Sequence, residues 1–338
     1  MLVKKIMLIG FGRVGKAFVK LLINKSRLFN TKYQFRVKII GISDPKYGVI
    51  YDENGLNLAR IIDHVNRIRS FKGLNGYKSN ISSLDLIEKY PAEILVEVTW
   101  SNLGDGEPGL THILTAIKKG MDVITTNKGP FVIAYREIMD LAKKYGVKIR
   151  YEGTVMSGTP VISLLTESLR GAEIRRIRGI LNGTTNFILT EMERGLTFSE
   201  ALKKAQELGY AEADPSLDID GLDPAAKSVI LFNSVFNGNY KLTDAKIIGI
   251  RDIDREQVIG ALKNGFRIKL ISNITSNGVT VMPEKLASND PLYNIGGVLN
   301  AIVITTEELG DITISGRGAG PREAAQAIIQ DLISLVQN

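Results

Sequence analysis

A chain of 338 residues exceeds what one hydrophobic core usually organises, so we expect two lobes. With 44% hydrophobic and 23% charged residues, it has the composition of a soluble globular protein, which excludes a disordered chain. It contains no cysteine, which excludes a disulfide framework, a thiolate nucleophile and a cysteine-type zinc site, and which fits a reducing cytoplasm.

The net charge of +7 comes from lysines and arginines that are scattered, with no basic block interleaved with aromatic residues. We therefore expect no nucleic-acid partner and favour phosphorylated small molecules. No apolar run approaches the roughly 20 residues of a membrane helix, so we expect no membrane partner. The opening run is cut by Lys4 and Lys5 and soon reaches glycine, which indicates a strand rather than a signal peptide.

The first part of the chain alternates short β-branched apolar runs with helical patterns. Strands are predicted at 4–10, 36–42, 93–99, 122–127 and 147–153, and helices at 15–25, 110–120 and 134–146. Strands that alternate with helices form a parallel sheet with right-handed crossovers. We therefore expect residues 1–150 to form an α/β domain around a doubly wound parallel sheet.

After residue 150 the pattern changes to longer predicted helices whose first residues can be recognised. TPVISLLTESLRG predicts a helix with Thr159 as N-cap and Pro160 in its first turn, where the missing N–H is no loss. TFSEALKKAQELG carries a capping box formed by Thr197 and Glu200 and stops at Gly209. These signals predict a second domain with its own helices.

Strand-like runs at 175–181, 266–274 and 278–283 intervene between these helices. They predict an α+β lobe over residues 151–315 with its own sheet. Residues 316–338 form a glycine turn that runs into an amphipathic helix, which we expect to return to the first domain.

A glycine fingerprint, GFGRVG, follows the first predicted strand at once and opens a helix. In G-x-G-x-x-G spacing, the first glycine makes a tight turn, the second lets a pyrophosphate approach the backbone, and the third permits close packing. A plain glycine turn is the alternative, but the position in the first strand–turn–helix unit predicts a Rossmann-like domain that binds NAD(P). The expected contacts are Gly10, Phe11, Gly12, Arg13, Val14 and Gly15.

The second predicted strand ends at GISDPK, where the side chain that meets the adenosine ribose normally lies. Asp44 favours a free 2′-hydroxyl and hence NAD, whereas Lys46 could meet a 2′-phosphate. Asp44 could equally be an aspartate that caps a turn before proline. The sequence leaves the choice between NAD and NADP open.

Polar residues also follow the next two strands, at the carboxyl ends where such sheets bind ligands. They are Thr99, Ser101, Asn127 and Lys128. A loop lysine is commonly a solvated surface residue, but at this edge Lys128 could reach the substrate or the nicotinamide.

The stretch GYAEADPSLDIDGLDPAAK contains five acidic side chains and ends on Lys227. An EF-hand loop needs glycine at position six and glutamate at position twelve. Counting from Asp218, the glycine is fourth and the twelfth residue is Val229, so we do not expect calcium. Apolar residues interrupt the acids, which also argues against a purely solvated surface.

The helix that follows, PAAKSVILFNSVF, is apolar on most sides, with Asp223 as its expected N-cap. Lys227 therefore lies in the first turn or so of an enclosed helix. Burial and the helix dipole disfavour its ammonium form, whereas Asp223 and Asp218 favour it. Such a lysine could exchange a proton near neutral pH as a general acid/base, or it could form a buried structural salt bridge.

The acidic segment resembles the signature of homoserine dehydrogenases position by position from Ala205 to Lys227. TTNKGP, YEGTVMSGTP, GILNGTTNFILTEM and GRGAGP also occur in the order and spacing of that family, so the resemblance covers essentially the whole chain. It is to the short form, without a regulatory extension or a fused aspartate kinase. Two departures, Trp100 and Arg317, bear on cofactor contacts and not on the chemistry.

The resemblance implies the NAD(P)-linked interconversion of L-homoserine and L-aspartate 4-semialdehyde, in threonine, methionine and isoleucine biosynthesis. It implies that Lys227 is the proton donor and that Lys128 assists near the reacting carbon. Asp223 and Glu212 would hold the substrate's amino end, and Asp218 would support the lysine. The backbone of Gly209 would line the same pocket, and its border would be formed by Asn182, Gly183 and Thr184.

The resemblance also implies contacts outside this cluster. Gly318 would approach the nicotinamide. EGTVMSGT matches a loop that coordinates a monovalent cation, sodium or potassium, and its alternative is an ordinary turn. The ligands would be Glu152 and the main-chain carbonyls of Val155, Ser157 and Thr159. The family further suggests a cytoplasmic homodimer formed through the second lobe, which would be the catalytic and dimerisation domain.

Two other functions fit parts of the pattern. One is a non-catalytic dinucleotide-binding sensor, against which the acidic cluster with its lysine argues. The other is a reductase of another amino-acid aldehyde, which differs only in substrate. The sequence assigns no donors to the substrate carboxylate.

Overall fold

A computed structural model describes residues 1–337 of the chain. The fold is α/β and divides into two compact units. The first unit contains residues 1–154 and the residues from Gly320 onward, and the second contains residues 155–319. Within residues 1–337, no helix is long and apolar enough to cross a membrane.

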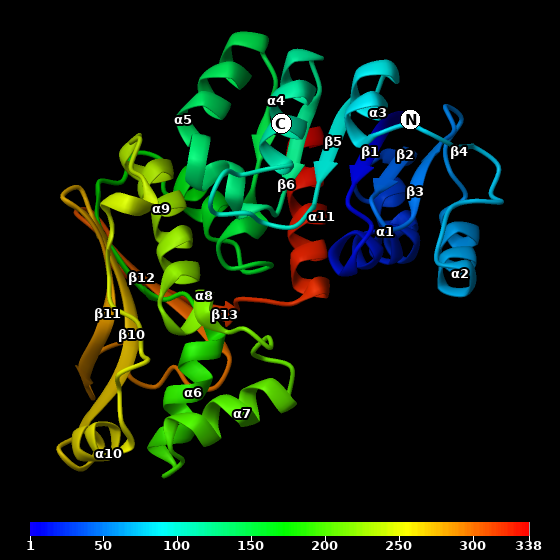
Figure 1. Ribbon diagram of the computed structural model, residues 1–338. Helices are drawn as coiled ribbons and strands as arrows, with labels where there is room; N and C mark the ends of the chain where they lie inside the picture. Colours follow the sequence, from blue (N-terminus) through cyan, green and yellow to red (C-terminus); the bar gives the residue numbers. More distant parts are fainter. Residues whose placement is uncertain (338) are drawn as a thin grey trace. The chain divides into compact units, whose positions relative to one another are not determined.

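The first unit is built on a seven-stranded sheet in the order β4-β3-β2-β1-β5-β6-β7 (Figure 1). Strands β2, β1, β5, β6 and β7 are parallel, which confirms the predicted Rossmann-like core, whereas β3 and β4 join antiparallel at one edge. The strands are β1 Leu2–Ile9, β2 Phe35–Asp44, β3 Gly48–Tyr51, β4 Tyr77–Lys78, β5 Ile94–Glu97, β6 Asp122–Thr125 and β7 Ile149–Arg150.

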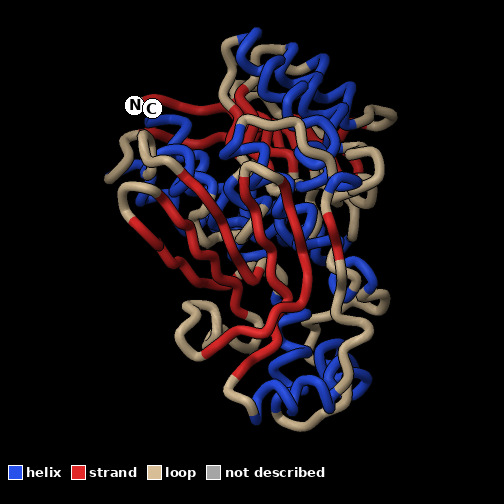
Figure 2. The backbone as a smooth tube through the Cα atoms, turned by 90° about the vertical axis from the view of Figure 1, so that its left-hand side faces the viewer, coloured by secondary structure: helices blue, strands red, loops and turns tan. Residues whose placement is uncertain are grey.

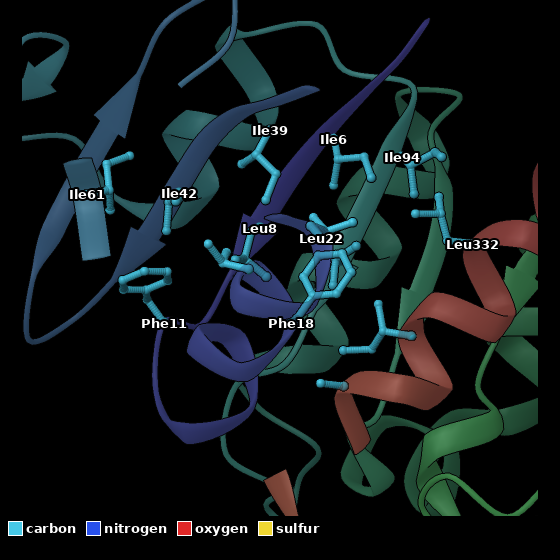
Figure 3. Packing of buried hydrophobic residues seen from close by; sticks show 14 of the residues in the cluster. Ile6, Leu8, Phe11, Phe18, Leu22, Ile39, Ile42, Ile61, Ile94 and Leu332 are labelled. Atoms are coloured by element: carbon cyan, nitrogen blue, oxygen red, sulfur yellow. The ribbon is translucent and has the colours of Figure 1, made fainter. Parts of the chain in front are cut away.

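Six helices of this unit connect or cover the strands. They are α1 Arg13–Thr31, α2 Leu58–Ile68, α3 Ser83–Lys89, α4 Gly109–Lys118, α5 Lys128–Tyr145 and α11 Pro321–Gln337. Helix α11 packs against α1 and β6, so the last described helix belongs to the first unit. The buried cluster between these elements includes Phe18 and Leu22 of α1 and Leu332 of α11 (Figure 3).

Two predicted elements of the first unit differ in extent. Helix α5 begins at Lys128 rather than 134, because Asn127 caps it by accepting a hydrogen bond from the N–H of Gly129. The strand predicted at 147–153 is cut to Ile149–Arg150, because Glu152–Thr154 form a short 3-10 helix, η1. The N–H of Glu152 donates to Asp331 of α11 at 3.0 Å, which fixes this turn.

The second unit carries a six-stranded sheet in the order β13-β12-β8-β10-β11-β9. Figure 2 draws the strands of the protein in red. All neighbouring strands are antiparallel except β11 and β9. The strands are β8 Ile174–Ile180, β9 Lys246–Ile247, β10 Phe266–Thr275, β11 Gly278–Ala287, β12 Leu299–Thr306 and β13 Gly310–Arg317. Helices α6 and α9 pack on strands of this sheet.

The helices of the second unit include several short ones. They are η2 Leu164–Ser168, α6 Gly183–Glu193, α7 Phe198–Glu207, α8 Ser216–Ile219, α9 Leu222–Phe236, η3 Leu242–Asp244 and α10 Arg255–Lys263. The Thr197–Glu200 capping box at the start of α7 is confirmed. Gly209, which ends this segment, has a φ of +74°.

The two other predicted N-caps are wrong. Thr159 caps no helix: its hydroxyl donates to the carbonyl of Arg317, and the segment forms only a π-helical turn at η2. Asp223 lies inside α9, because Gly221, with a φ of +86°, makes the turn one residue before the helix. The carboxylate of Asp223 is therefore available to side chains rather than to the helix backbone.

Candidate active site

The three glycines of the turn between β1 and α1 differ in how much space a side chain would have. Gly10 has a φ of +100°, and a Cβ there would lie 2.6 Å from the carbonyl oxygen of Val98. A Cβ on Gly15 would lie 2.2 Å from the carbonyl oxygen of Gly10. Over Gly12, a Cβ would meet nothing within 4 Å, so this glycine borders open space. That space, next to the amino end of α1, suits a pyrophosphate.

The other residues of the fingerprint have separate surroundings. Phe11 is fully buried against the rings of Tyr47 and Phe71, so only its main chain faces the turn. Its N–H donates to Oδ2 of Asp44 at 2.7 Å. Arg13 is exposed and Val14 is half-buried at the start of α1. The glycine turn is thereby tied to the end of β2.

Asp44 both caps a turn and lines a pocket. Its Oδ1 accepts a hydrogen bond from the N–H of Lys46 at 2.9 Å, as an aspartate before proline would. It also lines a pocket of about 580 Å³ together with Gly10, Gly12 and Thr99. This volume falls within the range of small-molecule and cofactor sites. The two interpretations of Asp44 are therefore compatible.

The polar residues that follow β5 and β6 form one network. Ser101 donates from Oγ to Oδ1 of Asn127 at 2.9 Å and accepts from the N–H of Lys128 at 3.0 Å. Asn127 donates from Nδ2 to Oγ1 of Thr99 and to the carbonyl of Trp100, each at 3.2 Å. The structure thus joins the predicted residues of two strand ends and leaves Lys128 half-buried at the start of α5.

Behind this network lies a buried carboxylate that the sequence analysis did not single out. Glu97, the last residue of β5, is fully buried and accepts hydrogen bonds from the N–H and hydroxyl of Thr99. Its Oε1 faces Nδ1 of the buried His112 at 3.7 Å. An acid at the end of the apolar run EILVE was the available signal, because such a group must find buried partners.

In the second unit, the acidic stretch separates into surface and interior acids. Asp214 accepts from the N–H and hydroxyl of Ser216, and Asp220 pairs with the guanidinium of Arg251 at 2.8 and 2.9 Å. Among residues 1–337, no group of three or more acidic or histidine side chains could hold a metal ion. Asp218 and Asp223 instead face other side chains of the unit.

These two acids meet Lys227 and Asn182. The Nζ of Lys227 lies 2.7 Å from Oδ2 of Asp223 and donates to the carbonyl oxygen of Leu181 at 2.7 Å. The Nδ2 of Asn182 donates to Oδ1 of Asp218 at 2.6 Å and to Oδ2 of Asp223 at 2.9 Å. Lys227 is only 7% exposed. The structure therefore places the lysine in a compact, partly buried network of two acids and one amide.

The groups of this cluster have opposing effects on the pKa of Asp218. Burial raises the pKa of the Asp218 carboxyl, and the nearby Asp223 raises it further, while Asn182 and Lys227 act in the opposite direction. Two acids so close to one ammonium can attract a second cation. The arrangement can therefore hold an amino group and exchange a proton in the same place.

The remaining predicted residues of this region lie at its edges. Asn182 caps α6 by accepting the N–H of Thr185, and the hydroxyl of Thr184 donates to the carbonyl of Tyr210 at 2.8 Å. A Cβ on Gly183 would lie 2.8 Å from the carbonyl oxygen of Val298, so the backbone passes closely there. Gly209 and Glu212 are exposed, and Glu212 accepts a hydrogen bond from Gln206 through its main-chain carbonyl.

The predicted cation ligands fall on both sides of the division between the units. Glu152 is buried in the first unit, and Val155, Ser157 and Thr159 begin the second. Ser157 has a φ of +52°, and its buried hydroxyl makes no hydrogen bond to the described residues. A buried hydroxyl oxygen without a hydrogen-bond partner is the kind of ligand that a hard cation such as sodium or potassium takes.

Gly318 follows β13 and is closely packed. A Cβ at Gly318 would lie 2.0 Å from Nδ2 of Asn300, which leaves no room for a side chain. Asn300 is 1% exposed, and neither polar atom of its amide has a hydrogen-bond partner among the described residues. The glycine turn of the second unit therefore lies over an unpaired amide.

Comparisons with known proteins find one family throughout. Its sequence models, described as "Homoserine dehydrogenase" and "Homoserine dehydrogenase, NAD binding domain", match residues 160–333 and 10–152. A homoserine dehydrogenase of Methanocaldococcus jannaschii is 43% identical, with 98% of each chain covered. An NAD(+)-dependent homoserine dehydrogenase of Pseudomonas canavaninivorans is 38% identical, with 99% of this chain and 96% of that one covered. The solved structure of a hyperthermophilic archaeal homoserine dehydrogenase in complex with NADPH has a TM-score of 0.86 at 32% identity, covering 99% of this chain and 98% of that one.

Proposed function

The chain belongs to the homoserine dehydrogenase family, and on that premise we propose that Lys227 moves the proton that accompanies hydride transfer. The family's members are NAD(P)-dependent oxidoreductases, and the reaction interconverts L-homoserine and L-aspartate 4-semialdehyde. The observation that carries the proposal is the buried contact of Lys227 with Asp223, 2.7 Å apart.

The chemistry divides between the cofactor and the protein. When bound, NAD(P) supplies or accepts the hydride. In the reducing direction, Lys227 gives a proton to the aldehyde oxygen as the carbon takes the hydride, and an alcohol results. In the oxidising direction, the neutral amine takes the proton of the hydroxyl group. Asp223 lies close enough to stabilise the ammonium in both directions.

Substrate recognition follows from the same acids. The amino group of homoserine is cationic, so it suits a site where Asp218 and Asp223 outnumber one lysine. Asn182 holds both carboxylates in place through its Nδ2. We assign Glu212 and the backbone of Gly209 to the same pocket by their match to the family signature, with Gly183 and Thr184 at its border. Lys128 and Gly318 are assigned on the same basis, to the reacting carbon and the nicotinamide.

The test replaces Lys227 with methionine, whose side chain has a similar length but no ionisable group that could donate a proton. Turnover should fall by roughly 10²- to 10⁴-fold, the usual contribution of one acid/base group, while dinucleotide binding persists. Lys203→Ala, which removes an exposed lysine on α7, is the matched control and should keep wild-type turnover. Unchanged turnover in the Lys227 variant would refute the assignment, and homologous amino-acid aldehydes in the same assay would test the substrate.

Further parts of the proposal concern the cation and the assembly. We assign a monovalent cation to Glu152 and the carbonyls of Val155, Ser157 and Thr159, supported by the orphaned hydroxyl of Ser157. Thermal unfolding in sodium or potassium against a large organic cation would reveal the site as a shift in melting temperature. We also expect a cytoplasmic homodimer formed through the second unit, which light scattering and fractionation of cells would check.

A further inference from the structure

The pocket of the first unit is lined by more than the glycine turn and Asp44. Its other walls include Val49 of β3, Ile81 and Ser83 at the start of α3, and Pro108 and His112 around α4. With the pyrophosphate at Gly12 and the ribose at Asp44, these walls are left to receive the base of the dinucleotide. Most of these walls are apolar, so the few polar groups there decide which base is preferred.

Ser83 and His112, which both line this pocket, are hydrogen-bonded to each other. The Oγ of Ser83 lies 2.7 Å from Nε2 of His112, a hydrogen bond in which either atom can be the donor. On the other side of the ring, Nδ1 of His112 lies 3.7 Å from Oε1 of Glu97, an electrostatic contact that is too long for a hydrogen bond. Glu97 and His112 are 0% and 3% exposed, whereas Ser83 is half-buried and borders the pocket. The three residues thus form a chain from the interior to the pocket wall.

The direction of the hydrogen bond follows from the surroundings of Glu97. Its carboxylate accepts from the N–H and hydroxyl of Thr99 and from the hydroxyl of Thr125, so donors surround it. An acceptor of this kind favours the tautomer of His112 that carries its hydrogen on Nδ1. Nε2 then accepts the hydroxyl hydrogen of Ser83. The lone pairs of the Ser83 oxygen are left to face the pocket.

We propose that Ser83 is a determinant of base specificity, which accepts a hydrogen bond from the exocyclic amino group of adenine, and that His112 and Glu97 are the positioning residues that fix its polarity. The proposal rests on the binding of NAD(P) in this pocket. An oxygen that can only accept favours the 6-amino group of adenine and disfavours a 6-oxo purine, which offers another acceptor there. Specificity would come from a hydroxyl that is prevented from rotating.

The experiment compares NAD with nicotinamide hypoxanthine dinucleotide, and NADP with its hypoxanthine counterpart, in homoserine oxidation. The two members of each pair differ at the purine 6-position, where an oxo group replaces the amino group, and at N1, which carries a hydrogen in hypoxanthine and none in adenine. For the wild type, the dissociation constant, measured by fluorescence titration without homoserine, should be roughly fivefold lower for the adenine dinucleotide, the scale of one hydrogen bond, and KM should show the same ratio. Ser83→Ala should bring the ratio close to one, and Ser83→Thr, which keeps the hydroxyl, should preserve it.

His112→Gln tests the positioning. It should reduce the base preference through KM, because an amide does not fix the direction of the bond to Ser83. Ser26→Ala, an exposed serine of α1, is the control and should keep the wild-type ratio. A ratio that survives Ser83→Ala overturns the proposal, and a wild-type preference for hypoxanthine overturns the assigned polarity. Absence of turnover with every dinucleotide, in wild type and control alike, would instead count against the proposed function.

Discussion

Two buried lysines of the second unit have very different surroundings. Lys227 lies near the start of α9, 7% exposed, with Asp223 and the carbonyl of Leu181 as partners. Lys269 lies in the middle of β10, fully buried, with its Nζ 3.4 Å from Glu193 and 3.3 Å from Asn186 of α6. Both have a carboxylate in reach, so the presence of a partner does not distinguish them.

The two lysines differ in the further charged and polar groups that surround each ammonium. Burial lowers the pKa of Lys269, and Glu193 opposes this without cancelling it. Asp218 and Asn182 extend the network of Lys227 to a second acid. Lys269 therefore behaves as a structural ion pair between sheet and helix, whereas Lys227 has an excess of negative charge that a substrate amine can use. A buried lysine becomes a functional candidate through its neighbours, and burial by itself does not suffice.

The largest effect on stability should come from Lys269→Met. This change removes the ammonium 3.4 Å from Glu193 and leaves its carboxylate only the guanidinium of Arg267, at 3.6 Å. Breaking a largely buried pair in this way costs about 3 kcal/mol of unfolding free energy. Urea unfolding would measure it. Turnover per folded molecule should stay within about twofold of wild type, because Lys269 is outside the acid cluster.

The double variant Lys269→Met with Glu193→Met separates charge from packing. Replacing both partners by apolar groups of similar size should recover most of the loss, because no buried carboxylate is left unpaired, and the partly exposed Arg267 keeps its contact with the ring of Tyr293. If the double variant is no more stable than Lys269→Met, the pair does not act as a unit. If Lys269→Met abolishes turnover in the folded protein, the distinction between the two lysines fails.

A smaller effect, on turnover, is expected for Asp223→Asn. The amide keeps the size of the side chain but removes the negative charge 2.7 Å from Lys227. Turnover should fall by roughly 30-fold, equivalent to about 2 kcal/mol in the barrier, and the KM for homoserine should rise. Asp214→Asn, which removes a surface acid of the same stretch, is the control and should leave both constants near wild type. A variant with wild-type kcat would show that Lys227 does not depend on Asp223.

The smallest effect concerns the pH dependence of stability at Asp218. Because the pKa of Asp218 is raised in the folded protein, the folded state holds this proton more tightly than the unfolded state does. Its contribution to stability is therefore present at acidic pH, below the unfolded value, and is lost as the pH rises through the folded value. Asp218→Asn should remove this dependence and leave the variant about 1 kcal/mol more stable at neutral pH, with reduced activity.

Unfolding curves of both proteins measured from acidic to neutral pH would test this. The advantage of the Asp218 variant should shrink toward acid, where the wild-type carboxyl is protonated as well. A variant that is less stable than wild type at neutral pH would mean that the bond from Asn182 to the carboxylate outweighs its burial.

The sequence predicted those features that depend on local signals. Glycine spacing identified the turn at Gly10 and Gly15, and the box of Thr197 with Glu200 identified the start of α7, because these motifs are complete within a few residues. The family resemblance named Asp223, Asp218 and Asn182, which the structure joins in one network with Lys227, whereas the roles of Glu212 and Gly209 stay predictions. A partner such as the carbonyl of Leu181, the residue after β8, lies 46 residues away from Lys227 and follows no spacing rule.

Failures of prediction had equally local causes. Asp223 looked like an N-cap because it precedes a proline. The turn at Gly221, with its positive φ, instead starts the helix at Leu222, one residue before Asp223. The carboxylate of Asp223 therefore contacts Lys227 and Asn182. The chain of Glu97, His112 and Ser83 was missed because its members come from three elements. Their contact depends on the packing of α3 and α4, which no motif encodes.

The return of α11 to the first unit has a consequence for synthesis. Residues 155–319 form the second unit and lie between the two segments of the first. Ile328, Ile329 and Leu332 of α11 complete the buried cluster of the first unit. During translation, the second unit can therefore emerge whole and fold while the first is still missing part of its interior. The first unit, although most of it is synthesised before the second, is completed only by the segment that follows its neighbour.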